Sequence, residues 1–499
     1  MKRLLSIILI LTVTISMVSC FNSGKKQDGK NDKQEEKELE LSTDPPKPLV
    51  FDEGTDMKTK LLALDNVISV EEHEGSYDET ESYMIVFERP LDPEDPSKGT
   101  FELHVGFCYT GDDTPNVFYC TGYGWHVMPE RFTPSCGTIS GKYNYIMPEY
   151  RYYGFSAPDG LDNSKPELWE YLTSENAAAD FHFVIGQFKR ILTGKWCFTG
   201  GSKGGVATLL QSMYYPDDAD IYYAISAPVM YSNDYPGLFE YMYESIGDDI
   251  YGPEEAARIR DLVLQFQVEA IKHSDVLEER YLEKVKDYLG DDLYDEIEDK
   301  DMFWDIEVLM AGFGVWQMES GGLFRASSIE QLEGAMSEKD EEERLDSILS
   351  LIHAMDDDPK FFTTGSFYYP YVIQQQSELG LFSMDFSYIR EELRKQGEED
   401  ALYITEEMEK ELYARSILTP EQMKTMKYDP KIMEDLKKHL ETTDRQIIVI
   451  NGTADLWNAY TPEQPDNPNV HIYEIPGMGH EGDGEKPEEV YEMLREVLG

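Results

Sequence analysis

The sequence predicts an α/β fold in which a doubly wound sheet is interrupted by a block of helices. Short apolar runs typical of strands alternate with helical segments in the first part of the chain, as expected for a sheet covered by helices on both faces. Between residues 231 and 438 the pattern changes to long, charged segments with the 3.6-residue period of helices, such as 253–270. Strand patterns then return, so this block is expected to be a helical cap inserted before the last strands.

The elements can be placed in order along the chain. Alternating or continuous apolar runs bounded by Pro, Gly and Asp predict strands over 82–87, 100–109, 117–121, 143–149, 195–199, 221–226, 445–450 and 470–475. Between these strands, helices are expected over 174–192 and 206–213. The sheet domain is therefore expected in two parts, 48–230 and 439–499, on either side of the cap over 231–438.

A serine flanked by glycines follows the predicted strand 195–199. Ser202 stands in the run GGSKGG, residues 200–205, directly before the predicted helix 206–213. A strand, a sharp turn and a helix form a nucleophile elbow, and glycines are needed there because side chains beside the serine would collide with the joined elements. We predict that Ser202 is a nucleophile presented at the end of the sheet.

An acid and a histidine follow the last two predicted strands. Asp455 lies in a loop after the strand 445–450, and His480 lies in the sequence PGMGH after the strand 470–475. The chain order Ser, Asp, His distinguishes α/β-hydrolases from the chymotrypsin and subtilisin types. We therefore predict an α/β-hydrolase fold in which His480 takes the Ser202 proton and Asp455 fixes the imidazole tautomer.

Several segments around these residues resemble a known family. The chain is similar to the prolylcarboxypeptidase and dipeptidyl-peptidase II group, and closer to its bacterial relatives, the secreted prolyl tri/tetrapeptidyl aminopeptidases. The resemblance implies a serine peptidase that cuts after proline near the N-terminus of a peptide. Two departures from the eukaryotic members are Lys203, where they have tyrosine, and Tyr150, where they have histidine. The segments that carry the resemblance are RYYGFS at 151–156, LTSENAAAD at 172–180, the GGSKGG run, Asn451-Gly452 with Asp455 and Trp457, and the final Gly-His.

Substrate contacts can be assigned to five residues. The oxyanion hole is expected to use the backbone N–H of Lys203 and a second donor at Tyr153 or Gly154, with the Lys203 side chain facing solvent or the helix surface. Trp457 is the best-placed aromatic face for a proline ring. Glu378, in a segment that resembles one near the active site of the family, is the candidate anchor for the substrate α-amino group.

The N-terminus predicts export. Residues 1–19 have a basic start and an apolar run too short for a confident membrane span, which is typical of a signal peptide. The sequence MVSC at 17–20 resembles a bacterial lipobox, so Cys20 is expected to carry a lipid, with simple secretion as the alternative. Residues 20–47 are polar and charged and predict a flexible tether. The expected location is the cell envelope, with contact to the membrane only through the lipid anchor on Cys20.

Composition restricts the classes of partner that we expect for this chain. The formal net charge of −54 argues against nucleic acid and anionic lipid headgroups as partners. Peptides are the substrates that the resemblance implies. No Cys and His grouping has zinc-ligand spacing, and neither a metal nor a cofactor is expected. Of the remaining cysteines, Cys197 is expected to be a buried free thiol, with at most one disulfide among Cys108, Cys120 and Cys136. Two alternatives stay open: an esterase or lipase of the same fold, and a non-catalytic lipoprotein that binds peptides or glycans.

Overall fold

The computed structural model describes most of the chain after the predicted tether. The described residues are 47–74, 81–124, 142–161, 169–320, 328–355, 367–409, 412, 426–480, 482 and 484–499. The part of the chain from Thr43 to Gly499 forms one compact unit. The predicted signal peptide, Cys20 and most of the tether lie outside the described residues, as does Cys136. In the part that is described, Cys108, Cys120 and Cys197 are buried free thiols, as expected for Cys197.

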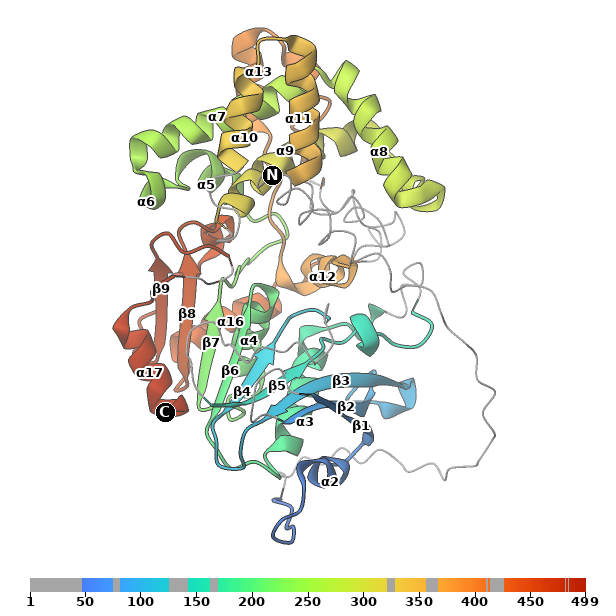
Figure 1. Cartoon of the computed structure of the whole chain (residues 1–499), viewed down its shortest axis with the longest axis vertical. Coiled ribbons are helices and arrows are strands. Elements are labelled where there is room, and N and C mark those ends of the chain that lie inside the picture. The colour runs from blue at the N-terminus through green and yellow to red at the C-terminus, as the bar shows by residue number, and fades with distance from the viewer. Residues whose placement is uncertain are drawn as a thin grey trace, which may run out of the picture. The chain divides into compact units, whose positions relative to one another are not determined.

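A nine-stranded mixed sheet forms the centre of the fold (Figure 1). Its strands in chain order are β1 (Val67–Glu74), β2 (Glu81–Pro90), β3 (Thr100–Tyr109), β4 (Asn116–Cys120), β5 (Asn144–Pro148), β6 (Trp196–Gly201), β7 (Ile221–Ile225), β8 (Gln446–Gly452) and β9 (Val470–Ile475). Their order across the sheet is β1-β2-β3-β5-β4-β6-β7-β8-β9. The first three strands and β5 pair antiparallel, and every pair from β5 to β9 is parallel. All the strands predicted from the sequence are present, and β1 is an additional one.

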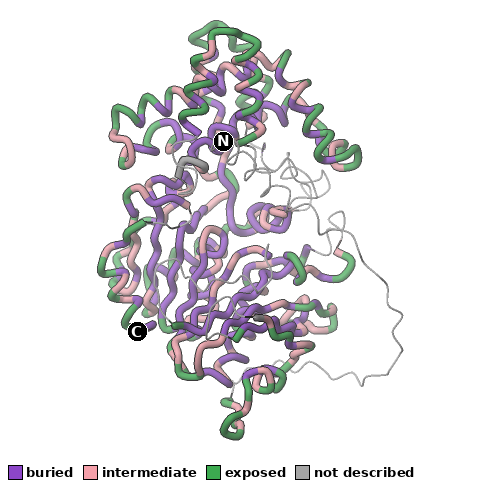
Figure 2. The backbone as a smooth tube through the Cα atoms, in the orientation of Figure 1, coloured by how far each residue is buried: buried purple, intermediate pink, exposed green. Residues whose placement is uncertain are grey.

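The parallel strands are apolar on both faces because each face has its own helical cover. In β6, Phe198 belongs to the large core that includes residues of α3 and α4, whereas the next residue back, Cys197, belongs to the smaller core against α17. Figure 2 shows the continuous burial of these strands. The helices of the sheet domain are α2 (Met57–Leu62), α3 (Ser174–Phe188), α4 (Lys203–Tyr214), α16 (Lys431–Thr442) and α17 (Glu488–Leu498).

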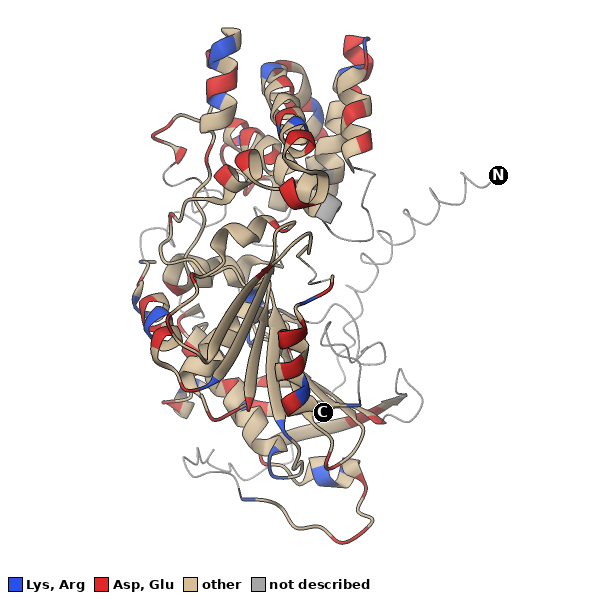
Figure 3. Ribbon diagram, turned by 90° about the vertical axis from the view of Figure 1, so that its left-hand side faces the viewer, with Lys and Arg blue, Asp and Glu red and all other residues tan. Residues whose placement is uncertain are grey.

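A run of helices separates β7 from β8, as the change of sequence pattern predicts. They are α5 (Leu238–Glu244), α6 (Asp248–Tyr251), α7 (Pro253–Lys272), α8 (Ser274–Tyr294), α9 (Lys300–Ser320), α10 (Ser328–Ser337), α11 (Glu341–Met355), α12 (Tyr369–Gln374) with the π-helical turn η7 (Gln375–Leu379), and α13 (Ser387–Gln396). Figure 3 marks the Asp and Glu positions along these helices in red. No helix in the described ranges is both long and apolar enough to cross a membrane.

The cap meets the sheet domain at the loop after β8. Tyr241 of α5 donates a hydrogen bond through its hydroxyl to Thr453 O at 2.9 Å, and the ring of Phe313 in α9 contacts that of Trp457. Helix α16 runs across the expected boundary at residue 438 and packs on α4, where His439 Nε2 lies 3.1 Å from Ser212 Oγ. The strand order, with a serine at the turn after β6, is that of an α/β-hydrolase fold.

Candidate active site

Ser202 occupies a strained turn between β6 and α4. Its backbone angles, φ 55° and ψ −125°, are costly for a residue with a side chain, by about 1–3 kcal/mol. The neighbouring glycines permit the turn: a Cβ at Gly200 or Gly204 would lie only 2.5 or 2.1 Å from Cys120 O. The Ser202 N–H donates to Ile225 O at 2.9 Å, which ties the turn to β7. This geometry is that of a nucleophile elbow.

Asp455 and His480 are brought together from two loops at the ends of β8 and β9. Asp455 Oδ2 lies 2.8 Å from His480 Nδ1; the aspartate is fully buried, and the histidine side chain is 21% exposed. The loops are joined by a hydrogen bond from Ala454 N to Met478 O at 3.0 Å. A Cβ at Gly452 would lie 1.9 Å from Met478 O, so only glycine allows the loops to come this close.

Lys486 holds the loop that follows His480. Its ammonium donates to Gly482 O at 2.5 Å and to Gly484 O at 2.9 Å, and the residue is buried. These contacts satisfy two carbonyl groups of a glycine-rich loop and reduce its freedom to move. The sequence contained no signal for this role, because a lysine near a C-terminal helix is usually a solvated surface residue.

The pair can activate a serine. With Nδ1 of His480 facing Asp455, Nε2 is the nitrogen that can receive a proton from Ser202. A buried carboxylate at this position favours the tautomer with hydrogen on Nδ1 and stabilises the imidazolium that forms. The three residues predicted from the sequence therefore occupy the three strand ends that the fold uses for a nucleophile, an acid and a base.

Trp457 lies beside the buried acid in an aromatic group. Its backbone N–H donates to Asp455 Oδ1 at 3.1 Å. Its ring is 5.6 Å from the rings of both Phe313 and Phe382, and 6.2 Å from that of Tyr460. The tryptophan is partly exposed, and the rings around it come from the cap as well as from its own loop. The structure thus places an apolar aromatic face next to the acid.

The side chain of Lys203 is buried, so the expectation that it faces solvent is wrong. Its ammonium lies 3.8 Å from the ring centre of Tyr150, 4.6 Å from that of Tyr153, 5.2 Å from that of Tyr371 and 5.4 Å from that of Tyr123. It also donates to the Tyr153 hydroxyl at 3.3 Å. Four aromatic faces are a cation–π environment. Burial lowers the pKa of Lys203 well below its usual value.

Glu378 is buried beneath this group of tyrosines. Its Oε1 accepts hydrogen bonds from Ser174 N and Ser174 Oγ, both at 2.7 Å, and from Gln374 Nε2 at 3.3 Å. Gln374 in turn donates to the Tyr150 hydroxyl at 3.0 Å. Burial raises the pKa of Glu378, while these bonds and the nearby Lys203 lower it. One carboxylate oxygen therefore satisfies the N-terminus of α3, a partner that the sequence did not reveal.

The loop after β5 carries the two residues predicted as second oxyanion donors. Tyr153 N donates to Tyr150 O at 3.2 Å within its own turn, so this N–H is not free for a substrate. Gly154 has φ 52° and packs on Glu149, whose Oε1 would lie 2.1 Å from a Cβ at that position. The strand next to β6 is β4 rather than β5. The loop after β4, which contains Tyr123, is therefore the one beside the elbow.

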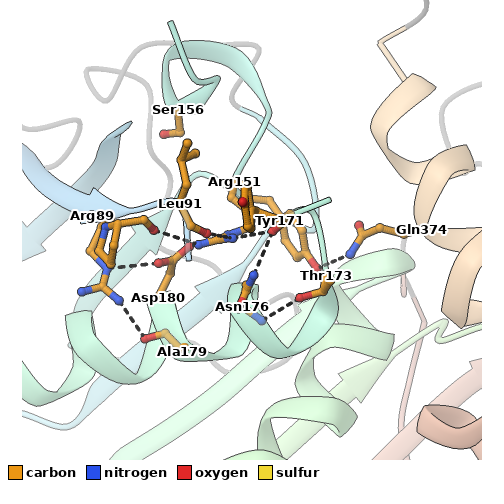
Figure 4. A network of polar contacts seen from close by, with 12 residues as sticks. Arg89, Leu91, Arg151, Ser156, Tyr171, Thr173, Asn176, Ala179, Asp180 and Gln374 are labelled. Atoms are coloured by element: carbon orange, nitrogen blue, oxygen red, sulfur yellow. Dashed lines mark hydrogen bonds and ion pairs between the residues drawn. The ribbon is translucent and has the colours of Figure 1, made fainter. Parts of the chain in front are cut away.

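A buried ionic network anchors the start of the loop after β5 (Figure 4). Asp180 of α3 accepts hydrogen bonds from Arg89 Nε at 3.0 Å and from Arg151 Nε at 2.8 Å, and all three side chains are at most 2% exposed. Arg151 Nη1 also donates to Leu91 O at 2.9 Å and to Tyr171 O at 2.5 Å. Such charge-assisted bonds are strong and directional, so the loop leaves β5 in one conformation.

Sequence reasoning missed Tyr123. Its side chain lies near that of Ser202, and its ring contacts that of Tyr153 at 5.6 Å. The available signal was the sequence TGYG at 121–124, which follows a predicted strand in the way that oxyanion loops do. As to metals, the described residues contain no group of three or more His, Cys, Asp or Glu side chains that could hold an ion.

Comparison with known proteins finds partial similarity to two curated relatives and to a solved structure. Prolyl tri/tetrapeptidyl aminopeptidase of Streptomyces mobaraensis is 29% identical over 193 residues, which are 39% of this chain and 38% of that protein. Lysosomal Pro-X carboxypeptidase of Mus musculus is 34% identical over 128 residues, 24% of each chain. The matched segments thus cover less than two fifths of either relative. Among solved structures, a bromoperoxidase from Bacillus anthracis is similar with a TM-score of 0.31 and 14% identity, covering 83% of this chain and 99% of its own.

The match to a family is much longer than the match to either relative. The profile of the PS-10 peptidase S37 family covers residues 51–485, which include Ser202, Asp455 and His480. This match confirms the resemblance to the prolyl peptidases that the sequence motifs indicated. The chain belongs to the PS-10 peptidase S37 family.

Proposed function

We propose that this protein is an exported serine exopeptidase that releases short proline-ended peptides, of three or four residues, from free N-termini. The observation that supports this most is the buried Asp455–His480 pair at 2.8 Å, at the strand ends that follow the Ser202 elbow. Membership of a peptidase family and the partial likeness to a prolyl tri/tetrapeptidyl aminopeptidase support peptides as the substrate class.

The reaction proceeds in two steps through an acyl-enzyme. Ser202 Oγ attacks the carbonyl carbon of the scissile bond while His480 Nε2 takes the serine proton. The carbon–nitrogen bond then breaks, and His480 gives that proton to the leaving amine. Water, deprotonated by His480, attacks the ester and releases the peptide, which returns the proton to Ser202. Asp455 holds the imidazole through Nδ1 and stabilises the imidazolium.

Trp457 is proposed as a wall of the proline pocket. A proline ring offers only apolar surface, and the partly exposed indole beside Asp455 presents a flat apolar face of suitable size. Phe313 and Phe382 hold the indole in place through edge contacts at 5.6 Å. Specificity for proline would then depend on rings contributed by the cap.

Glu378 is kept as the proposed anchor for the substrate α-amino group. Its buried position limits which of its two carboxylate oxygens can act in this way. Its Oε1 is used by Ser174, so an anchor role requires Oε2 to face the substrate ammonium. We expect Glu378→Gln to raise KM for substrates with a free amine while leaving kcat nearly unchanged. An unchanged KM would leave Glu378 with only its contacts to α3 and Gln374.

Export and lipidation are proposed from the N-terminal sequence. The run MVSC at 17–20 supports lipid attachment at Cys20 and a location in the cell envelope. Expressed in a bacterial host, the full chain should incorporate labelled palmitate, and Cys20→Ser should abolish the label. Incorporation into Cys20→Ser at the wild-type level would exclude this anchor.

The activity is tested with the chain from residue 21 onward and a panel of short peptides. The peptides differ in the position of proline and in acetylation of the N-terminus, and products are identified by mass spectrometry. We expect cleavage after a proline at the third or fourth position, loss of cleavage on acetylation, and no turnover by Ser202→Ala. Hydrolysis of p-nitrophenyl esters without any peptide cleavage would favour the esterase alternative, and an inert protein would favour a peptide-binding role.

A further inference from the structure

The loop after β4 lies directly against the nucleophile elbow. Gly122 has φ 74°, and a Cβ there would lie 2.6 Å from Gly204 N and 3.0 Å from the backbone of Lys203. This contact follows from the strand order, since β4 pairs in parallel with β6 from Asn116 to Cys120. A group on this loop can therefore reach a carbonyl oxygen bound at Ser202.

The first two N–H groups that the loop presents are already used within it. The Gly122 N–H lies beside the Cys120 thiol and lowers its pKa, and the Tyr123 N–H donates to Thr121 Oγ1 at 3.1 Å. Backbone donors from this loop normally complete an oxyanion hole in the fold. Here these two amides stabilise the turn, which leaves a different group to act on the substrate oxygen.

The Tyr123 hydroxyl is the polar group of this loop that reaches the nucleophile. It lies close enough to the Ser202 side chain to affect the pKa of Tyr123. Its ring is held by edge contacts with Tyr153 at 5.6 Å, Tyr368 at 5.5 Å and Tyr371 at 5.9 Å. The hydroxyl is thus fixed beside the serine by rings on two sides, which is the preorganisation that oxyanion stabilisation requires.

We propose that the Tyr123 hydroxyl is a catalytic residue and the second donor of the oxyanion hole, together with the Lys203 N–H. Lys203 opens α4, and the first N–H groups of a helix have no acceptor within it. The positive end of the α4 dipole favours negative charge at the same place. This role rests on the proposed nucleophile, Ser202.

In the acylation step the Tyr123 hydroxyl donates a hydrogen bond to the substrate oxygen and keeps its proton. When Ser202 Oγ bonds to the substrate carbon, the π electrons of the carbonyl move to its oxygen, and the serine proton moves to His480 Nε2. Tyr123 then donates a hydrogen bond to the new oxyanion. Collapse of the intermediate restores the carbonyl, and the proton on His480 leaves with the amine. Burial raises the pKa of Tyr123 well above its usual value, so the hydroxyl stays protonated and able to donate.

The test is Tyr123→Phe, which keeps the ring and removes only the hydroxyl. The matched control is Tyr109→Phe, because the Tyr109 hydroxyl bonds to Asp112 at the far end of β3. Turnover is measured with Ala-Ala-Pro-p-nitroanilide and with p-nitrophenyl acetate, since both reactions pass through an oxyanion. The inhibition constant of the corresponding peptide aldehyde is measured as well, because the aldehyde forms a tetrahedral adduct with the serine.

We expect Tyr123→Phe to lower kcat by about 10²–10³-fold, with KM within about threefold of the wild-type value. The inhibition constant of the aldehyde should rise by a factor similar to the loss in kcat. Tyr109→Phe should match the wild type. A Tyr123→Phe enzyme with kcat within threefold of the wild type, or with unchanged aldehyde affinity, would overturn the proposal.

Labelling separates this result from a failure of the proposed function. Ser202 in the wild type and in Tyr123→Phe should be modified to completion by a fluorophosphonate on long incubation, and peptide mapping locates the adduct. An adduct absent from Ser202 in the wild type would overturn the nucleophile and the role of Tyr123 with it. The wild type could also cleave p-nitrophenyl acetate but no peptide, with this esterase activity reduced in Tyr123→Phe. That result would support the oxyanion role of Tyr123 and contradict the peptidase proposal.

Discussion

Replacing Asp455 with asparagine keeps the shape of the side chain and removes its charge. In the structure Asp455 Oδ1 accepts a hydrogen bond from the backbone N–H of Trp457 at 3.1 Å, and Oδ2 faces His480 Nδ1 at 2.8 Å. The Trp457 N–H needs an acceptor, so the amide oxygen of asparagine is held at the Oδ1 position and its NH2 group turns toward His480. Nδ1 then has to accept a hydrogen bond, which puts the imidazole proton on Nε2, the nitrogen that must take the proton of Ser202.

The size of the loss follows from these contacts. Turning the amide the other way would leave the Trp457 N–H facing an NH2 group, and an unmade bond of this kind costs about 1–3 kcal/mol. The active tautomer is therefore about 10- to 100-fold less populated, at about 1.4 kcal/mol for each factor of ten. Without the carboxylate, the imidazolium is also less stable in the transition state. We expect kcat to fall by about 10³–10⁴-fold at neutral pH, a loss of about 4–5 kcal/mol.

The assay compares Asp455→Asn with Asp444→Asn, which changes an aspartate whose side chain is 85% exposed. Rates with Ala-Ala-Pro-p-nitroanilide and melting temperatures are measured for both variants. Asp444→Asn should match the wild type, and Asp455→Asn should fold and turn over very slowly. A kcat for folded Asp455→Asn within tenfold of the wild type would refute the assignment of Asp455 as the acid.

Two further predictions concern a buried charge and a close approach of the backbone. Burial lowers the pKa of Lys203 in the folded state, so the unfolded chain binds more protons than the folded one. The wild type should therefore gain stability relative to Lys203→Met as pH rises toward 10.5. Urea unfolding of both proteins at several pH values measures this difference. A parallel pH dependence of the two proteins would contradict a buried Lys203. Gly452→Ala would place a Cβ 1.9 Å from Met478 O and separate the acid loop from the histidine loop, so kcat should fall about 10²-fold. Gly334→Ala, with open space at its Cβ, is the control, and equal activity of the two alanine variants would contradict this close contact.

The sequence was enough to propose the triad because each proposed member follows a strand with a strong local pattern. Ser202, Asp455 and His480 lie directly after β6, in the loop after β8 and in the loop after β9, and parallel neighbouring strands bring their carboxyl ends to one edge. Chain order and strand pattern therefore carry the information. The mixed character of the sheet and β1 were less accessible, because pairing direction depends on contacts between segments that no local pattern encodes.

Chain order favoured the wrong loop as the neighbour of the elbow, although the sequence TGYG at 121–124 was a local signal for the right one. β4 precedes β5 in the chain, yet β4 lies between β5 and β6 in the sheet. A prediction made in chain order selects the loop after β5, with Tyr153 and Gly154, as the neighbour of the elbow. The crossover places Tyr123 there instead, and the strand order reveals this.

Residues 367–379, which include α12 and η7, pack directly against the candidate site. Phe367, Tyr368 and Tyr371 contact the Tyr123 ring, and Tyr371 also faces the Lys203 ammonium at 5.2 Å. In the next turn Glu378 satisfies the N-terminus of α3. Residues far apart in the chain thus share one buried aromatic and polar group, which explains why neither the burial of Lys203 nor the partners of Glu378 were predictable. Removal of the cap would therefore disturb the packing around the Tyr123 hydroxyl, the proposed second oxyanion donor, so the enzyme without its cap should have a lower kcat rather than broader access for substrates.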